Sequence, residues 1–590
     1  MVSNSAFMYD DYTGSLRFMP TFRLIVSVLL FGFLAQAEEI KITLLATTDL
    51  HGNLLPYDYF TASPVPRGLA KIATLTERER AENPNTLLVD CGDTIQGTPL
   101  EAVYQQYVES GHLPLGLTFR STPLARDPMI AAMNAIGYDA MVVGNHEFNF
   151  GLRNLAKARS EARFPWISAN IRAASGAPAQ AFAPYFLKSI AGIKIAVVGI
   201  TTPLIPSWEA EEHYQGYRFE DGVDAVRRVV AELRERERPN VVIIAAHAGL
   251  DRNPAKDSAA TGDSRENMVY QIATEVKGID AIVFGHTHSE LAGLRLGDVL
   301  LMQPKNWGAS LGRLDLVLEK SSEGWKVVSK LSKLIPATAE TTSDPKVTEI
   351  AKPYHELAED FLNHRVADSP VSLDARLARV EDTAIIDAVQ QVELYYSKAD
   401  VSFASSFNPR AAIPKGALTV RQIAALYVYE NQLYAIEGTG KMVRQALENA
   451  ARYYNTCSGG CSQGPLINPA VIGYNYDMAE GVDYEIDITQ PQGSRIRNLR
   501  WHGKPLADDQ PLRIAVNNYR AGGSAGYSMF RNAKVVWRSP EEIRDLVIRY
   551  YGENRPLPSM PSNNWRVVPE SARQELRSEA LGEARNVTSK

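Results

Sequence analysis

The sequence predicts an α/β protein, and two observations support this prediction. Short, β-branched apolar runs alternate with helix-forming stretches from Ile42 onward. The runs are nearly continuous in apolar residues, as expected of sheet strands covered on both faces, and their alternation with helices is typical of a layered α/β domain. The 590 residues also leave room for a second domain, because single domains rarely exceed about 250–300 residues.

Six runs are predicted to be strands, and two stretches between them have the apolar spacing of amphipathic helices. The predicted strands are Ile42–Ala46, Thr86–Val89, Ala140–Val143, Ile193–Val198, Val241–Ala245 and Ala281–Phe284. The predicted helices are Leu69–Glu82 and Val223–Arg236.

The overall composition is that of an ordinary globular protein, with 45% hydrophobic and 22% charged residues. The formal net charge is -6. Because there is no basic excess to neutralise a phosphate backbone, a polymeric nucleic-acid partner is disfavoured.

The N-terminus has the features of an export signal. An apolar run at 24–34 follows two arginines and precedes Ala35-Gln36-Ala37, a small-x-small cleavage site. Residues 1–37 are therefore predicted to be a signal peptide, with Met19 as an alternative start. The run is short for a bilayer span, so no stable membrane span is expected after cleavage, although an uncleaved anchor is an open alternative. The expected location is periplasmic, extracellular or at the cell surface.

Export permits disulfides, and the chain has three cysteines. Cys457 and Cys461 flank a short flexible loop that could close a small disulfide, whereas Cys91 is expected to be buried.

Polar residues follow five of the six predicted strands. Because the carboxyl ends of such strands meet at one edge of a sheet, we expect these residues to converge. Aspartate and histidine without thiolate suit Zn, Mn, Fe or Mg-like divalent ions, and the donors are too many for one tetrahedral site, so two ions are inferred. The polar turns are Asp49-Leu50-His51-Gly52, Asp90-Cys91-Gly92-Asp93, Asn145-His146, His247-Ala248-Gly249 and Gly285-His286-Thr287-His288.

These turns resemble those of the calcineurin-like metallophosphoesterases, and among them the exported 5′-nucleotidase and 2′,3′-cyclic-nucleotide 2′-phosphodiesterase family. The resemblance extends from about Ile42 to Asn564. It implies a layered α/β/β/α domain at 38–336 and a C-terminal α/β nucleotide-recognition domain at 366–556. Residues 337–365 are expected to be a linker, with an amphipathic helix at Pro345–His364, and 557–590 to be a tail, of which Glu570–Lys590 is charged, weakly helical and expected to be mobile.

The resemblance implies two metal sites that share Asp93. The first would be held by Asp49, His51, Asp93 and His288, and the second by Asp93, Asn145, His247 and His286. The choice among Zn, Mn, Co and Fe stays open. A water bound to these ions would attack phosphorus, and the ions would hold the attacking and leaving oxygens.

His146 is not among the implied metal ligands, and the resemblance implies that it stabilises the transition state or protonates the leaving alcohol. Many 5′-nucleotidases have an aspartate three residues later, but this chain has Asn149. An amide can accept a hydrogen bond from imidazole but cannot neutralise an imidazolium. The Asn form resembles the cyclic-phosphodiesterase branch.

In the C-terminal domain, the resemblance implies that Tyr429 and Tyr519 clamp a nucleobase and that Asn431 bonds its edge. Asn408 and Arg410 match a stretch lining the substrate side, but Pro409 departs from the usual glycines and puts the role of Arg410 in doubt. Loop packing of the tyrosines is the competing interpretation.

The function expected from these features is hydrolysis of 5′-nucleotides, of 2′,3′-cyclic nucleotides or of both, in nucleotide catabolism and salvage. Two alternatives are open. The protein could hydrolyse another anionic ester, or it could be a nucleotide-binding surface protein without turnover.

Overall fold

The computed structural model describes residues 38–120, 124–253, 258–259, 265–322, 324–429, 431–458, 461 and 464–586. The predicted signal peptide, 1–37, lies outside the described residues. Among the residues that are described, no helix has both the length and the apolar character needed to cross a bilayer.

The N-terminal half is built on two six-stranded sheets. Each is mainly parallel at its centre, with antiparallel strands at an edge. The first sheet has the order β18 (Gly324–Pro336), β17 (Ser310–Ser321), β1 (Glu39–Thr47), β4 (Thr86–Asp90), β5 (Ala140–Val142) and β6 (Trp166–Ile167). The second has the order β15 (Leu291–Leu296), β16 (Val299–Gln303), β14 (Ala281–Phe284), β11 (Val241–His247), β9 (Ile193–Thr201) and β8 (Tyr185–Ile190). All six predicted strands are present.

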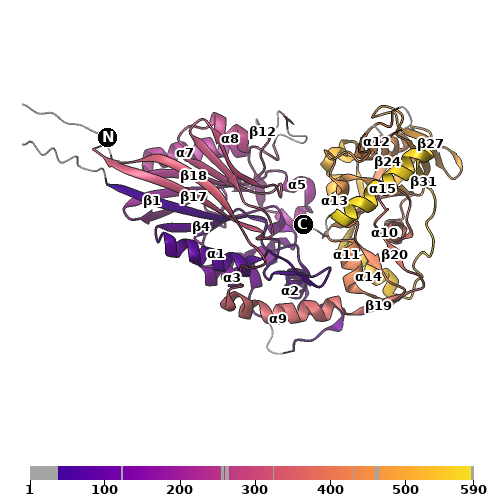
Figure 1. Cartoon of the computed structure of the whole chain (residues 1–590), viewed down its shortest axis with the longest axis horizontal. Helices are drawn as coiled ribbons and strands as arrows, with labels where there is room; N and C mark the ends of the chain where they lie inside the picture. The colour runs from indigo at the N-terminus through magenta and orange to yellow at the C-terminus, as the bar shows by residue number, and fades with distance from the viewer. Residues whose placement is uncertain are drawn as a thin grey trace, which may run out of the picture. The chain divides into compact units, whose positions relative to one another are not determined.

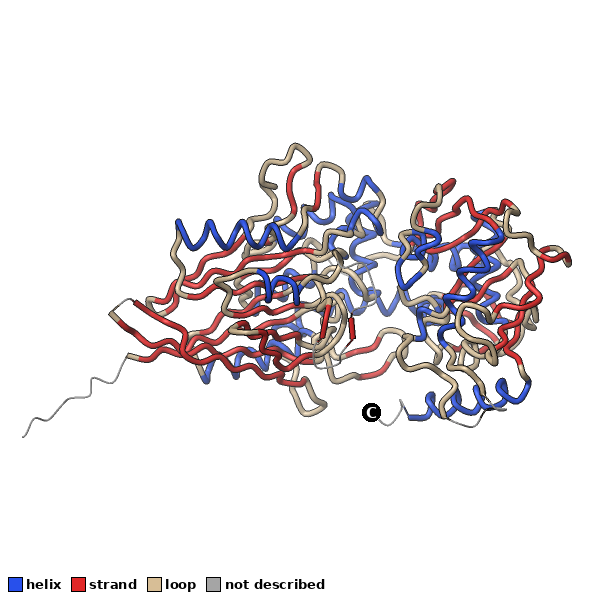
Figure 2. Tube along the Cα trace, turned by 90° about the horizontal axis from the view of Figure 1, so that it is seen from above, coloured by secondary structure: helices blue, strands red, loops and turns tan. Residues whose placement is uncertain are grey.

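The two sheets pack face to face and helices cover their outer faces. One apolar cluster joins Ile42 and Leu87 of the first sheet to Ile195 and Ile243 of the second, all without exposed surface. Figure 1 shows α1 and α3 against the first sheet and α7 and α8 against the second, and Figure 2 shows the strands of the sheets running side by side. The order of layers is α/β/β/α, which confirms the predicted fold class. The helices of this half are α1 (Leu69–Glu82), α2 (Pro99–Ser110), α3 (Pro128–Ile136), α4 (Gly151–Glu161), α5 (Ile205–Trp208), α6 (Glu211–Tyr214), α7 (Gly222–Arg236) and α8 (Val269–Glu275).

The expected linker segment contains α9 (Pro345–Leu362). Asp344 caps its first turn by accepting the Val347 N–H at 2.8 Å, and Pro345 occupies the first helical position, where no N–H is needed. Its apolar face is buried against α1, α2 and α3, so the linker is seated on the first domain.

The C-terminal half has its own sheets and helices. Its larger sheet has the order β25 (Asp477–Glu480), β21 (Val401–Ser405), β29 (Pro511–Asn517), β24 (Gln432–Thr439) and β30 (Val535–Glu542). A four-stranded sheet has the order β28 (Lys504–Pro505), β27 (Ile496–Trp501), β26 (Asp483–Asp487) and β31 (Trp565–Val568). The helices are α10 (Ala384–Ser397), α11 (Val420–Leu426), α12 (Gly440–Ala450), α13 (Asn518–Ala521), α14 (Ile543–Gly552) and α15 (Glu570–Asn586).

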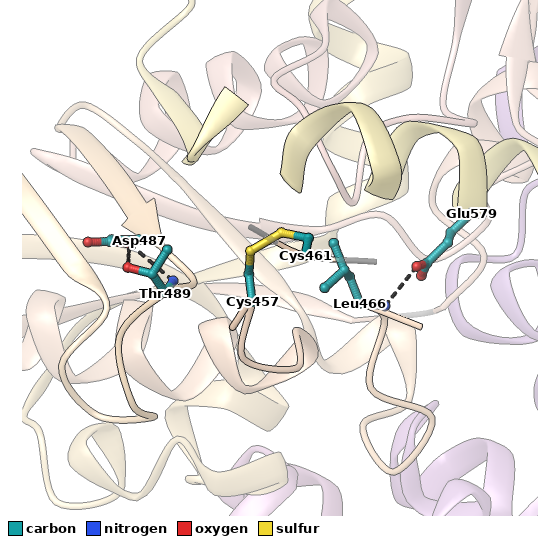
Figure 3. Close-up of a disulfide and its surroundings, with 6 residues drawn as sticks. All are labelled: Cys457, Cys461, Leu466, Asp487, Thr489 and Glu579. Carbon is teal, nitrogen blue, oxygen red and sulfur yellow. Dashed lines mark hydrogen bonds between the residues drawn. A yellow bond between two sulfur atoms is a disulfide. The ribbon is translucent and has the colours of Figure 1, made fainter. Parts of the chain in front are cut away.

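The C-terminal tail is helical over Glu570–Asn586, in agreement with its weak helical pattern, but this helix is docked on the domain rather than free of it. β31 pairs with β26, and Ala572 and Leu576 of α15 have no exposed surface. Figure 3 shows Glu579 of α15 directed at the Leu466 backbone, whose N–H it accepts at 2.7 Å. The helix is charged overall, but its few apolar residues share one face, and that face is enough to dock it.

Cys457 and Cys461 form a disulfide beside this helix, with Cα atoms 4.8 Å apart (Figure 3). Cys91 is buried and free, as expected from the sequence.

Candidate active site

The polar residues that follow the strands converge at one edge of the two sheets. Backbone hydrogen bonds join the turns: Asp49 N–H donates to Gly92 O at 2.9 Å, and His51 N–H donates to Asp93 O at 2.8 Å. The Asp49 carboxylate accepts the His286 N–H, across 237 positions of sequence. Gly144 permits the close approach, since a Cβ there would lie 2.2 Å from Asp93 Oδ1.

Five of the seven predicted metal ligands have a left-handed backbone, which costs non-glycine residues of order 1–3 kcal/mol each. Residues of this kind cluster at functional sites, where the surrounding structure holds them in place. They are Asp49 (φ 48°), His51 (φ 46°), Asp93 (φ 59°), His286 (φ 74°) and His288 (φ 52°).

The side chains form overlapping groups whose ligand atoms lie within 4.8 Å of one another. The groups are Asp49, His51 and His288; His51, Asp93 and His146; and Asp93, His247 and His286. Asn145 joins the third group, because its Oδ1 lies 3.0 Å from His247 Nε2. Asp93 belongs to two groups, as a bridging ligand would.

The hydrogen bonds of two histidines test whether cations fit here. His51 Nδ1 lies 3.0 Å from the Gln96 carbonyl and His247 Nδ1 lies 2.8 Å from the Cys91 carbonyl. A carbonyl only accepts, so both Nδ1 atoms carry a proton, and Nε2 is the nitrogen that each ring can offer to a cation. This arrangement is typical of metal-binding histidines.

Those Nε2 atoms face other electron-rich atoms. His51 Nε2 lies 3.0 Å from His288 Nε2. His247 Nε2 lies 3.0 Å from Asn145 Oδ1 and 3.0 Å from Asp93 Oδ2. Each of these close contacts needs a shared proton or a cation between its two atoms, and the set of nitrogen and oxygen ligands suits hard to borderline divalent ions.

The pKa values of the histidines follow from the same packing. Burial, with the neighbouring His288, lowers the pKa of His51 to about 3. Burial also lowers that of His288 to about 4. Both are therefore neutral, as a ligand must be. Burial lowers the pKa of His247 too, but the charge of Asp93 outweighs this and raises it to about 10, so that without a cation a proton joins these two side chains.

Glu147, which the sequence analysis did not single out, holds the Asp93 loop. It has no exposed surface, and its Oε2 accepts the Gly144 N–H at 2.6 Å and the Asp93 N–H at 3.0 Å, while Oε1 accepts the Thr94 N–H at 2.6 Å. The sequence did contain one indication of this role, because Glu147 is a carboxylate that directly follows His146, shortly after a strand predicted to be buried.

His146 lies beside the cluster with both ring nitrogens engaged. Nδ1 lies 2.5 Å from Asn149 Oδ1, as the spacing of the two residues permits on one turn. Nε2 lies 3.9 Å from Asp93 Oδ2 and 3.3 Å from the Tyr519 hydroxyl. Burial raises the pKa of Tyr519 well above its ordinary value, so that hydroxyl keeps its proton and can donate.

Trp208, also missed, links the cluster to Tyr519. Its ring stacks on Tyr519 with centroids 5.8 Å apart and on His286 at the same centroid distance. Its carbonyl accepts a hydrogen bond from Asn518 at 2.8 Å. Nothing in the local sequence pattern distinguishes this tryptophan from a core residue.

The other predicted substrate residues lie in the C-terminal half. Tyr429 is 39% exposed and packs edge-on against Phe407 and Tyr474. Tyr429 and Tyr519 share no ring partner among the described residues.

The remaining three differ in how they are engaged. Asn431 is buried and donates to the Tyr427 hydroxyl at 3.4 Å. Asn408 is bonded to backbone, donating to Ala425 O and accepting the Arg410 N–H, both at 3.0 Å. Arg410 is exposed.

Comparison with known proteins assigns the class. Residues 42–290 match the calcineurin-like phosphoesterase family, and residues 365–532 match the 5′-nucleotidase, C-terminal domain family. The 2′,3′-cyclic-nucleotide 2′-phosphodiesterase/3′-nucleotidase of Salmonella typhimurium is 30% identical over 90% of this chain and 90% of its own length. The trifunctional nucleotide phosphoesterase protein YfkN of Bacillus subtilis is 30% identical over 91% of this chain, which spans 39% of YfkN.

Among solved structures, a Staphylococcus aureus protein described as a candidate 5′-nucleotidase matches with a TM-score of 0.76 and 25% identity, covering 90% of this chain and 100% of that one. Fold and site therefore define a metallophosphoesterase. The chain belongs to the family of calcineurin-like phosphoesterases with a 5′-nucleotidase C-terminal domain, as the resemblance implied.

Proposed function

We propose that this chain is an exported phosphohydrolase of nucleotides that works with two divalent cations. The observation that carries the proposal is the convergence of imidazole nitrogens with carboxylate and amide oxygens around Asp93. One cation would be held by Asp49, His51, Asp93 and His288, and the other by Asp93, Asn145, His247 and His286. When bound, the pair would neutralise phosphate charge and supply a nucleophilic hydroxide.

The protein's own groups would orient the substrate and move the proton. Glu147 holds the Asp93 loop, so that the bridging carboxylate does not shift as charge changes. His146 presents Nε2 toward the cluster from outside the ligand set and is placed to protonate the leaving oxygen. The Tyr519 hydroxyl at 3.3 Å connects this histidine to the C-terminal half.

The choice of a nucleotide rests on the C-terminal half and on the relatives. Tyr429 is 39% exposed, so its ring offers a flat face on which a base can stack. Stacking of one base on such a ring contributes about 1–3 kcal/mol to the free energy of binding. Relatives in the family are named for nucleotide phosphoesters.

Export is supported by the predicted signal peptide and by the Cys457–Cys461 disulfide, since disulfides persist in oxidising compartments.

The test is phosphate release from AMP against ring opening of 2′,3′-cyclic AMP, at equal enzyme, with manganese, cobalt or zinc. We expect turnover of at least one substrate and its loss on chelation. Nucleotide binding without turnover under every metal would refute the proposal, as would activity that survives chelation.

A further inference from the structure

Glu209 is a buried carboxylate with no place in the metal ligand set. It lies between α5 and α6 and is 9% exposed. Each of its oxygens has one donor: Asn149 Nδ2 lies 2.5 Å from Oε1, and His213 Nδ1 lies 3.0 Å from Oε2. A continuous row of side chains therefore runs from His146 through Asn149 and Glu209 to His213.

This row determines how the Asn149 amide is turned. An ionised carboxylate only accepts hydrogen bonds, so the amide must present its NH₂ group to Glu209. Its oxygen is then left to face His146 Nδ1, at 2.5 Å. Nδ1 must therefore be the donor of this hydrogen bond, and Nε2 is the ring nitrogen that faces the cluster.

His213 engages the second oxygen of Glu209, with Nδ1 3.0 Å from Oε2. Burial lowers the pKa of His213, but the hydrogen bond and charge of Glu209 outweigh burial and raise it above its ordinary value. Because His213 occupies Oε2 of Glu209, Oε1 is left to accept the hydrogen bond from Asn149.

We propose that Glu209 is a positioning residue for His146, acting through Asn149, and that it is the reason an amide can serve at position 149. The inference rests on the proposed function. As the oxygen of water bonds to phosphorus, one water proton passes to solvent, from which His146 regains a proton after turnover, and the bond from phosphorus to the leaving oxygen breaks with its electron pair going to that oxygen. The oxygen takes the proton from His146 Nε2, and a neutral imidazole remains, with its Nδ1 proton still held by Asn149.

The competing explanation is that Glu209 only ties α6 to the domain through His213. The two explanations differ in what rescues a Glu209 variant. If Glu209 acts by turning the amide, a carboxylate at position 149 makes it unnecessary, because both oxygens of Asp are acceptors. If Glu209 acts only on α6, a change at position 149 restores nothing.

The test compares Glu209→Gln, Asn149→Asp and the double variant, with Glu212→Gln as matched control. Glu212 lies on α6 and is exposed, so the control makes the same charge change nearby. Each is assayed on AMP or 2′,3′-cyclic AMP, whose leaving oxygens need a proton, and on p-nitrophenyl phosphate, whose leaving group does not.

We expect Glu209→Gln to lower kcat on the nucleotide about tenfold, short of the roughly 10²–10⁴ of complete general-acid loss, with KM within about twofold. Its kcat on p-nitrophenyl phosphate should stay within about twofold of the wild-type value. The control Glu212→Gln should keep kcat within about twofold of wild type on both substrates. Asn149→Asp alone sets two carboxylates against each other and should lower the thermal midpoint. The double variant should recover both the midpoint and, to within about threefold, kcat on the nucleotide.

Three outcomes would overturn the inference: wild-type kcat in Glu209→Gln, equal losses on both kinds of leaving group, or a double variant no better than Glu209→Gln. If Glu209→Gln does not fold, the double variant alone tests the inference, because the inference requires the double variant to be folded and active. A wild-type protein with no turnover would instead refute the proposed function.

Discussion

Replacing Glu147 with glutamine tests how the site is supported. The Glu147→Gln substitution keeps size and shape but turns one acceptor oxygen into an NH₂ donor. Even in the less costly orientation, the Thr94 N–H, now 2.6 Å from Oε1, would face another donor. Stranding one buried N–H costs about 1–3 kcal/mol, and the bonds from Asp93 and Gly144 lose about 1 kcal/mol each without the carboxylate charge. We therefore expect a loss of about 3–5 kcal/mol in the free energy of unfolding.

Urea unfolding followed by tryptophan fluorescence measures this loss, and metal content per chain measures its effect on the site. Both should fall, because the backbone groups that lose their hydrogen bonds belong to Asp93, the proposed shared ligand, and to its neighbours. The matched control is Glu393→Gln, the same change at a carboxylate that is also buried but bonded to the Ser402 hydroxyl rather than to backbone N–H groups. A loss under about 1 kcal/mol in Glu147→Gln, with normal metal content, would show that this carboxylate does not support the loop.

Three further predictions concern Asp93 as the proposed shared ligand, Tyr429 as the proposed stacking ring and the buried carboxyl group of Glu393. Asp93→Asn should remove at least one bound metal per chain and lower phosphate release about a hundredfold or more, and unchanged metal content would argue against a bridging role. Tyr429→Ala should raise KM for the nucleotide about 5- to 100-fold and leave p-nitrophenyl phosphate unaffected, whereas equal KM values would favour another anionic ester. Burial raises the pKa of Glu393 from 4.5 to about 8, so the folded protein keeps a proton that the unfolded chain releases between these values, and stability falls as pH rises through that window. Glu393→Gln should therefore raise the thermal midpoint at pH 8 more than at pH 4.5, and an equal effect at both would contradict the shift.

Local pattern alone was enough to predict much of the fold. The predicted strand Ala281–Phe284 and helix Leu69–Glu82 have the same bounds in the structure as β14 and α1. Such elements can be predicted because burial of one or both faces requires apolar residues at regular intervals along the sequence. At the C-terminal end the pattern indicated a weak helix but not its docking, because α15 packs through few apolar residues such as Ala572 and Leu576.

The sequence by itself indicated candidate cation ligands, since Asp49, Asn145 and His286 each lie within three residues of the end of a strand and strand ends converge. Only the tertiary structure decided how they are held. Three contacts support the site across long stretches of sequence. Glu147 contacts Asp93 across 54 positions, Glu209 contacts Asn149 across 60, and Trp208 contacts Tyr519 across about 310. Hydrogen-bond partners at such separations follow from packing of whole layers, and no local period encodes them.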